Sequence, residues 1–188
     1  PKLVQGIQQT YNTTQERFAS PLNYNLEIDE YWSAFERDKL FGAKHDAYST
    51  RMTGSVYMNP EYEDSDLEKA LQWAIWSSET ESPVCCVAVF PRWKKSRYMN
   101  LLRHPNVRVA CQFARGTFSF LPPDHWSNSR RAGTAKWQVL VIEIANEAGR
   151  NQYHTGRDQD IEQAGRLFGA KPVNIVRPTS EDASEGIF

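Results

Sequence analysis

Several features that commonly assign a function are missing from this sequence. No Gly-x-Gly-x-x-Gly follows a strand-like segment, so the usual fingerprint of dinucleotide-binding sheets is absent. The first ten residues contain no apolar core of signal-peptide length, and no apolar run approaches the roughly 20 residues that cross a bilayer. We therefore expect no membrane association. The net charge of −1 gives no overall attraction to nucleic acid, so a polyanion must be met by a local patch.

Cysteine and histidine are few and form no metal-binding pattern. Of the three cysteines, Cys85 and Cys86 are adjacent within an apolar run, which predicts buried thiols in a reducing compartment. We accordingly expect an intracellular protein, cytoplasmic or nuclear. The four histidines are scattered and no Cys-x-x-Cys occurs, so the sequence predicts no metal site.

The most informative stretch is TGSVYMNPEY, residues 53–62. A short strand-like run ends abruptly in Asn59-Pro60-Glu61-Tyr62, because proline cannot continue a strand ladder. The Asn59 oxygen and the Pro60 carbonyl can accept both hydrogens of an exocyclic amine while the Tyr62 ring stacks on the base that carries it. The alternative is a plain strand that ends in a proline turn.

The residues after this stretch predict a strand–helix–strand unit. Helical spacing of apolar residues covers residues 66–78, with Ser65 and Glu68 at the spacing of a capping box. Residues 83–90 read as a buried parallel strand, and ligands of open α/β sheets bind at the carboxyl ends of such strands. Further predictions are a short helix at 96–103, strands at 107–113 and 139–144, a loop at 114–135 and a helix at 160–168.

The chain also resembles a known family. The pieces that carry the resemblance are, in order, Phe18-Ala19-Ser20-Pro21-Leu22-Asn23, Ser33-Ala34-Phe35, Phe41-Gly42, Gly54-Ser55 leading into Asn59-Pro60, Val89-Phe90-Pro91-Arg92-Trp93 and the strand at 139–144. Through them, residues 17–146 resemble the methyltransferase domain of the phosphorylated-CTD-interacting factor family, the cap-specific adenosine methyltransferases. No counterpart of the family's WW domain is expected.

The resemblance implies an α/β, Rossmann-like methyltransferase fold with a mixed sheet flanked by helices. It implies S-adenosylmethionine as methyl donor and the exocyclic N6 amine of adenine in RNA or DNA as acceptor. The family box is Asn-Pro-Pro-Phe, so Asn59, Pro60 and Tyr62 are the catalytic candidates and Glu61 departs from the pattern. The donor-binding candidates are Phe18, Ser20, Pro21, Leu22, Asn23, Phe35, Asp38 and Gly42.

A basic cluster follows the second predicted strand. It contains Arg92, Lys94, Lys95, Arg97, Arg103 and Arg108, interleaved with Trp93 and Tyr98, and Arg130 and Arg131 extend it. Aromatic rings within a basic groove are typical of single-stranded nucleic-acid binding. The alternatives are a solvated charged face and, for Trp93, a ring that caps the sheet.

We predict three segments: a tail or short helix at 1–16, a methyltransferase-like core at 17–146 and an extension at 147–188. Because the chain opens on Pro1 and is little longer than a catalytic core, we expect a fragment or processed product. Two functions are open, an adenine methyltransferase or an inactive module that binds nucleic acid or scaffolds a larger viral or mobile-element protein. Either one allows a partner that recruits the substrate.

Overall fold

The computed structural model describes residues 2–25, 27–120, 133–167 and 169–178. Its elements, with η for a 3-10 helix, are α1 (Lys2–Tyr11), β1 (Gln15–Arg17), β2 (Glu30–Ser33), η1 (Glu36–Phe41), β3 (Lys44–His45), β4 (Gly54–Met58), α2 (Asp64–Ser78), β5 (Val84–Pro91), η2 (Arg97–Arg103), β6 (Val107–Phe113), β7 (Ser119–Phe120), β8 (Gly133–Thr134), β9 (Val139–Ala145), α3 (Glu147–Tyr153) and α4 (Asp158–Arg166).

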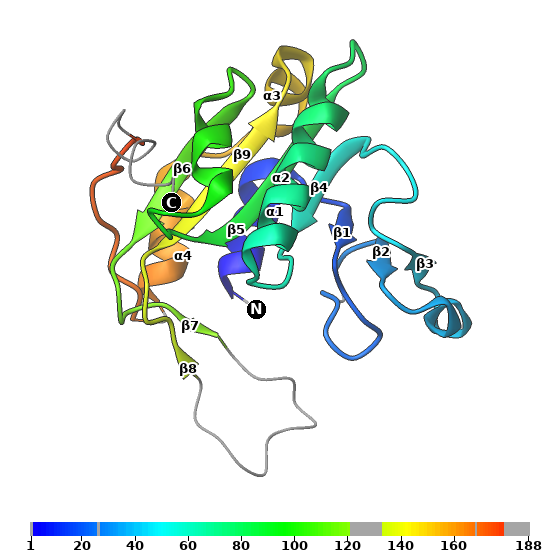
Figure 1. The fold of residues 1–188 in the computed structure, drawn as a ribbon, viewed down its shortest axis with the longest axis horizontal. Helices are drawn as coiled ribbons and strands as arrows, with labels where there is room; N and C mark the ends of the chain where they lie inside the picture. Colours follow the sequence, from blue (N-terminus) through cyan, green and yellow to red (C-terminus); the bar gives the residue numbers. More distant parts are fainter. Residues whose placement is uncertain (1, 26, 121–132, 168, 179–188) are drawn as a thin grey trace.

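Seven strands form one mixed sheet in the order β3-β2-β1-β4-β5-β9-β6 (Figure 1). The first five of these are mutually parallel, whereas β9 is antiparallel to both of its neighbours. This confirms an α/β fold with a mixed sheet flanked by helices. Apart from β9, the order is the 3-2-1-4-5-6 order of doubly wound sheets, whose direction of winding reverses between β1 and β4.

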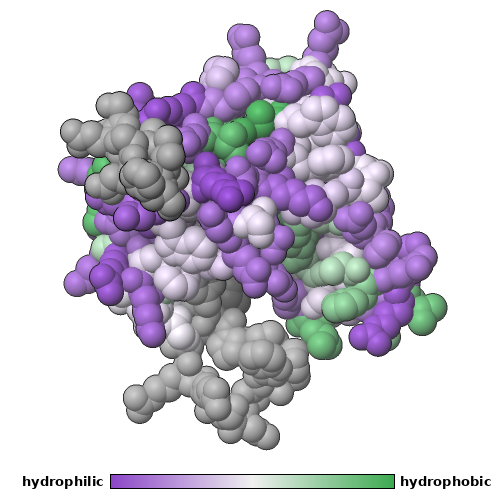
Figure 2. Space-filling model, viewed as in Figure 1, coloured by the Kyte–Doolittle hydropathy of each residue, from purple (hydrophilic) through white to green (hydrophobic). Residues whose placement is uncertain are grey.

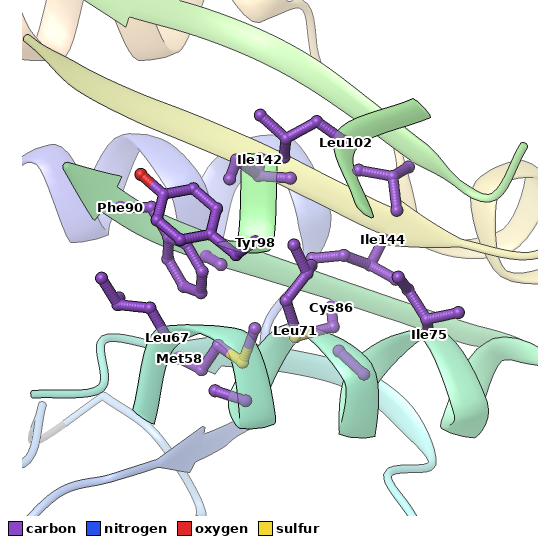
Figure 3. Packing of buried hydrophobic residues seen from close by; sticks show 14 of the residues in the cluster. Met58, Leu67, Leu71, Ile75, Cys86, Phe90, Tyr98, Leu102, Ile142 and Ile144 are labelled. Carbon is purple, nitrogen blue, oxygen red and sulfur yellow. The ribbon is translucent and has the colours of Figure 1, made fainter. Parts of the chain in front are cut away.

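Helices cover both faces of the sheet. Side chains alternate along β5, so Cys86, Ala88 and Phe90 join the core under α2 and η2, while Cys85, Val87 and Val89 join the core under α1 and α4. In Figure 1, α2 lies in front of the sheet and α1 and α4 lie behind it. Figure 3 shows the front core, where Leu67, Leu71 and Ile75 of α2 face the strands.

The predicted strand–helix–strand unit is confirmed, since β4 and β5 are parallel and joined through α2. The predicted capping box is wrong. The helix begins at Asp64, two residues earlier than predicted, and its N-cap is Glu63, which makes no side-chain capping bond. The helix predicted at 96–103 is a 3-10 helix, η2, and the strand predicted at 107–113 is β6.

β1 and β2 are strands that the sequence patterns did not predict. In β1 the two buried side chains are charged: Glu16 and Arg17 are 6% and 1% exposed. The Glu16 carboxylate accepts hydrogen bonds from the backbone and side-chain nitrogens of Asn25 at 2.8 and 2.9 Å. The Arg17 guanidinium lies 3.6 Å from the centre of the Trp32 ring and donates to the Ala47 carbonyl at 2.7 Å. Partners that the fold brings close from other parts of the chain therefore allow charged residues in an inner strand.

α3 and α4 pack on the back of the sheet through an ionic network around Glu143, whose side chain is fully buried. Its carboxylate accepts from Arg108 at 2.5 Å and from Arg150 at 2.6 Å. Arg108 also pairs with Asp158 of α4. Gly149 lets α3 approach β5, because a Cβ there would lie 2.0 Å from the Val84 carbonyl oxygen. The segment boundaries at 16/17 and 146/147 stay predictions.

The predicted state of the cysteines is confirmed, because all three are free and buried. The predicted loop at 114–135 contains the short antiparallel pair β7–β8. The helix predicted at 160–168 is α4, which begins two residues earlier. Among the described residues, no helix combines the length and the apolar character that crossing a membrane requires.

Candidate functional site

The two most informative sequence segments leave the sheet side by side. β1 and β4 are parallel neighbours, and their last residues, Arg17 and Met58, are paired in the register. The next residues along the chain are Phe18 and Asn59, so the predicted donor segment and the Asn-Pro box start at adjoining positions of the carboxyl edge. This is also the point where the winding of the sheet reverses, which is where open α/β sheets bind their ligands.

The Asn-Pro box is held in place by Tyr62. The Tyr62 hydroxyl lies 3.1 Å from Asn59 Oδ1 and 3.2 Å from the Val89 carbonyl oxygen, and it has one proton to donate to these two acceptors. Burial raises the pKa of Tyr62 well above its usual value, so the hydroxyl stays protonated. Pro60 is buried and Asn59 is half-buried. The Tyr62 hydroxyl thus orients the amide oxygen of Asn59, whereas the sequence predicted only a stacking role for the Tyr62 ring.

Three aromatic rings meet beside this box, and we call them the aromatic corner: Tyr62, Trp93 and Trp137. Their centroids are 5.7 to 6.4 Å apart and each pair is steeply inclined, with interplanar angles of 70° to 83°. Trp93 packs against the front core and Trp137 against the back core. Sequence reasoning missed Trp137, whose one signal is its place just before the apolar strand β9.

The segment after β1 forms a compact turn. Asn23 Oδ1 accepts from the backbone nitrogen of Ser20 at 2.7 Å and from its hydroxyl at 3.0 Å. Phe18 has a φ of 65°, in the left-handed region that aromatic residues rarely adopt, and its ring packs edge-on against Tyr48. Such backbone strain gathers at functional sites. Pro21 is half-buried and Leu22 is exposed.

The donor candidates after β2 lie on and around η1. Asp38 Oδ2 accepts from the Ser33 hydroxyl at 2.5 Å, and Gly42, with a φ of 86°, ends η1 as its C-cap. Phe35 is exposed and lies near the Arg37 guanidinium. A small cluster connects this segment to the turn after β1, made of Ala19, Tyr24, Tyr31 and Ala43.

Exposed apolar side chains surround the same segments. Leu22, Phe35, Leu40 and Phe41 are 69%, 58%, 86% and 67% exposed. Figure 2 shows green, apolar atoms at the lower right, over the region of η1 and β3 in Figure 1. Such a surface suits an apolar face of a ligand or a partner, and single exposed residues elsewhere need no explanation.

The basic cluster is only partly one surface. Lys94, Lys95 and Arg97 are exposed, although Arg97 lies 3.9 Å from Glu68, and Arg92 is half-buried. Arg108 does not belong to it, because its guanidinium is engaged by Glu143 and Asp158. Arg130 and Arg131 lie outside the described residues. Within the described part of the chain, no three His, Cys, Asp or Glu side chains are grouped so that they could hold a metal ion.

Comparison with known proteins identifies the family. The family model described as "Phosphorylated CTD interacting factor 1 WW domain" matches residues 1–123, which is more than half of the chain. The chain belongs to the phosphorylated CTD interacting factor 1 family. No curated protein matches it.

The match corrects one expectation. The sequence predicted no counterpart of the WW domain of the phosphorylated CTD interacting factor 1 family, yet the matching model is named for that domain. In this structure the matched residues contain β1 to β6, which are every strand of the seven-stranded sheet except β9, together with α1 behind that sheet and α2 in front of it. The match therefore shows the family and leaves the activity of this region to be argued from its geometry.

Proposed function

We propose that this chain has a Rossmann-like methyltransferase fold and transfers a methyl group from S-adenosylmethionine to the exocyclic N6 amine of adenine in RNA or DNA. One observation carries the proposal: the donor candidates after β1 and the amine-holding candidates after β4 leave adjoining positions at the reversal point of the sheet. Membership of the phosphorylated CTD interacting factor 1 family supports it.

The residues after β1 and β2 fit a nucleoside-containing donor. Asp38 offers a half-buried carboxylate that can accept hydrogen bonds from ribose hydroxyls. The exposed Phe35 ring and the exposed Leu22 side chain offer apolar contacts for a base. The strained residue Phe18 begins the turn after β1, beside the strand end from which the Asn-Pro box leaves the sheet. When bound, S-adenosylmethionine supplies an electrophilic methyl group.

The residues after β4 fit the acceptor. Asn59 Oδ1 and the Pro60 carbonyl would accept the two hydrogens of the amine and aim its lone pair at the methyl group. Tyr62 fixes the orientation of the Asn59 amide, and the aromatic corner offers a ring on which the base can stack. Catalysis would then rest on positioning, for which the protein needs neither a nucleophile nor a metal.

A second candidate is an inactive module that binds nucleic acid or scaffolds a larger protein. Two observations favour it: the negatively charged Glu61 is exposed within the box, and the Tyr62 hydroxyl already occupies one lone pair of Asn59 Oδ1. We also propose a protein partner that brings the substrate, which accords with the family's name. The buried free thiols suit an intracellular setting, cytoplasmic or nuclear.

Transfer of labelled methyl groups to adenine-containing RNA and DNA oligonucleotides separates the two candidates. Wild type should methylate one of them, and Glu61→Pro should be the faster enzyme, because proline presets the turn and removes a charge beside the polyanion. If both proteins are silent while an active family member works in the same assay, the inactive module replaces the enzyme.

A further inference from the structure

Three exposed cations outside the basic cluster lie at the same edge of the sheet as the candidate site. We call them the hairpin base, because they surround the start of the β7–β8 pair: Arg115, Lys136 and Lys171. Val139, which begins β9, is paired with the last residue of β5, Pro91, and with the last residue of β6, Phe113. Arg115 and Lys136 therefore adjoin strand ends at the carboxyl edge, from which the Asn-Pro box also leaves β4.

Backbone hydrogen bonds bring these three positions together. The Gly116 nitrogen donates to the Ala135 carbonyl at 2.9 Å, and these two residues adjoin the first two cations in the sequence. The backbone nitrogen of Lys171 donates to Thr117 Oγ1 at 2.9 Å, and its carbonyl accepts from the Ala114 nitrogen at 2.7 Å. In Figure 1 the segment that follows α4 correspondingly reaches the start of β7 and β8. The hairpin base is thus one region of the surface.

This region carries positive charge that is not balanced locally. The three segments that form it, residues 112–120, 133–142 and 169–178, contain no Asp or Glu, although the whole chain has 23. None of the three cations forms a salt bridge with a residue that the structure describes. Lys39 and Lys44, by contrast, lie 3.1 and 2.7 Å from a carboxylate. An exposed surface with cations and no carboxylates favours a polyanion as its ligand.

The hairpin base continues directly into the aromatic corner. Lys136 precedes Trp137, whose ring lies 6.1 Å from the ring of Tyr62. On the other tryptophan of the corner, the exposed Lys94 follows Trp93. An exposed lysine therefore adjoins each tryptophan of the corner. Aromatic rings with cations beside them are what single-stranded nucleic acid requires, because its bases stack on the rings while the cations bind its backbone.

We propose that the hairpin base binds the phosphate backbone of a single-stranded nucleic acid whose adenine lies at the aromatic corner. Phosphates repeat along a strand, so these cations need not converge on one phosphate to contribute to its binding. The strand is unpaired because stacking on the corner requires a free base. This inference rests on the proposed function and adds the substrate class to it: a strand of several nucleotides, bound on both sides of the target adenine.

Fluorescence anisotropy with a labelled, adenine-containing RNA or DNA strand of about 12 nucleotides tests this at salt concentrations from about 0.1 to about 1 M. Each phosphate contact on a single strand contributes about 0.7 to the slope of log affinity against log salt concentration. The slope should therefore fall by about two when Arg115→Gln, Lys136→Gln and Lys171→Gln are combined. The ratio of wild-type to variant affinity should accordingly grow about 100-fold as salt falls from about 1 M to about 0.1 M.

The chain offers a matched control on the same strand. Arg103 is exposed and precedes β6, whereas Arg115 follows β6 at the opposite edge of the sheet. Arg115→Gln alone should lower the slope by about 0.7, and Arg103→Gln should leave it unchanged. These single variants decide the result if thermal unfolding shows that the triple variant does not fold.

An unchanged slope in the folded triple variant, or no binding of wild type to either strand, overturns the inference. So does a triple variant that loses binding to a peptide with several phosphoserines and keeps binding to the strand, because the surface would then serve a protein. Methyl transfer is measured separately. Transfer by wild type with an unchanged slope in the variants would refute the role of the hairpin base alone, whereas a lowered slope without any transfer would refute the proposed reaction alone.

Discussion

Truncation of Asn59 to alanine separates positioning from folding. In the structure Asn59 Oδ1 accepts from the Tyr62 hydroxyl at 3.1 Å, and the hydroxyl keeps the Val89 carbonyl at 3.2 Å as a second acceptor. The variant should therefore lose only about 0.5–1.5 kcal/mol of stability, the worth of one hydrogen bond. For a chain of this size that is a fall in Tm of about 2–4 °C per kcal/mol.

The rate of methyl transfer should fall much further, by about 100-fold to 1000-fold, as when one preorganised donor or acceptor is removed from an active site. Single-turnover transfer of labelled methyl groups measures the rate, and thermal unfolding measures the stability. Asn59→Asp keeps an acceptor oxygen and should retain more activity than Asn59→Ala, while Asn151→Ala, at an exposed position of α3, should match wild type. Full activity in Asn59→Ala would mean that the amine is held elsewhere.

Three further outcomes are expected. Gly149→Ala should cost about 1–3 kcal/mol through overpacking against the β5 backbone, whereas Gly133→Ala, with open space around it, should cost little; urea unfolding that gave equal values would refute the close approach of α3 to β5. Glu143→Gln should cost about 3 kcal/mol at pH 7, the low end for breaking a buried pair, since both arginines keep access to water. Burial alone would raise the pKa of Glu143, but Arg108 and Arg150 together lower it below its usual value. The stability difference between wild type and Glu143→Gln should therefore be fully present above about pH 4.3 and should shrink as the pH falls through the lowered pKa of Glu143. A stability difference that is independent of pH down to about pH 2 would contradict this. Neutralising the exposed Lys94, Lys95 and Arg97 together should weaken oligonucleotide binding whatever the sequence. The slope of log affinity against log salt concentration should fall by about one for each phosphate that is no longer bound. An unchanged slope would mean that these three side chains are not part of the interface.

The apolar part of the fold was predictable from sequence. β4, β5, β6, β9 and α2 were recognised because their buried residues are apolar and recur at strand or helix spacing, as in the continuous run of β5. The predicted strand–helix–strand unit implied that the carboxyl ends of its two strands lie at the same edge of the sheet, and the parallel neighbours β4 and β5 confirm this.

The polar part was not predictable. β1 inserts Glu16 and Arg17 into the sheet interior, and their partners, Asn25 and Ala47, lie 9 and 30 residues away in the sequence. A pattern of apolar spacing predicts that charged residues lie on the surface, because it contains no information on a carbonyl or amide from a distant part of the chain that would hydrogen-bond to the charged group. α3 was missed for a related reason, because it is polar and its approach to β5 depends on Gly149.

At the candidate site, the sequence predicted the Asn-Pro box and Trp93 but not how they meet. Tyr62 was assigned to stacking, whereas the structure shows its hydroxyl on Asn59, and that interaction depends on where the chain turns after β4. Trp137 reaches the same corner across 75 residues of sequence from Tyr62 and belongs to no local motif. The participation of Arg108 in an internal ionic network, and not in the basic cluster, likewise depends on the packing of α4.

The most direct test of the central claim is an NMR titration of the ¹⁵N-labelled chain with S-adenosylhomocysteine, the demethylated product of the donor. Saturable shifts that gather on the amides after β1 and β4, at Phe18, Ser20, Asn23, Asn59 and Tyr62, are the predicted result, with Lys94 and Lys95 unaffected. Shifts confined to other elements, or a spectrum unchanged at millimolar ligand, would contradict a methyl-donor site at the reversal point of the sheet.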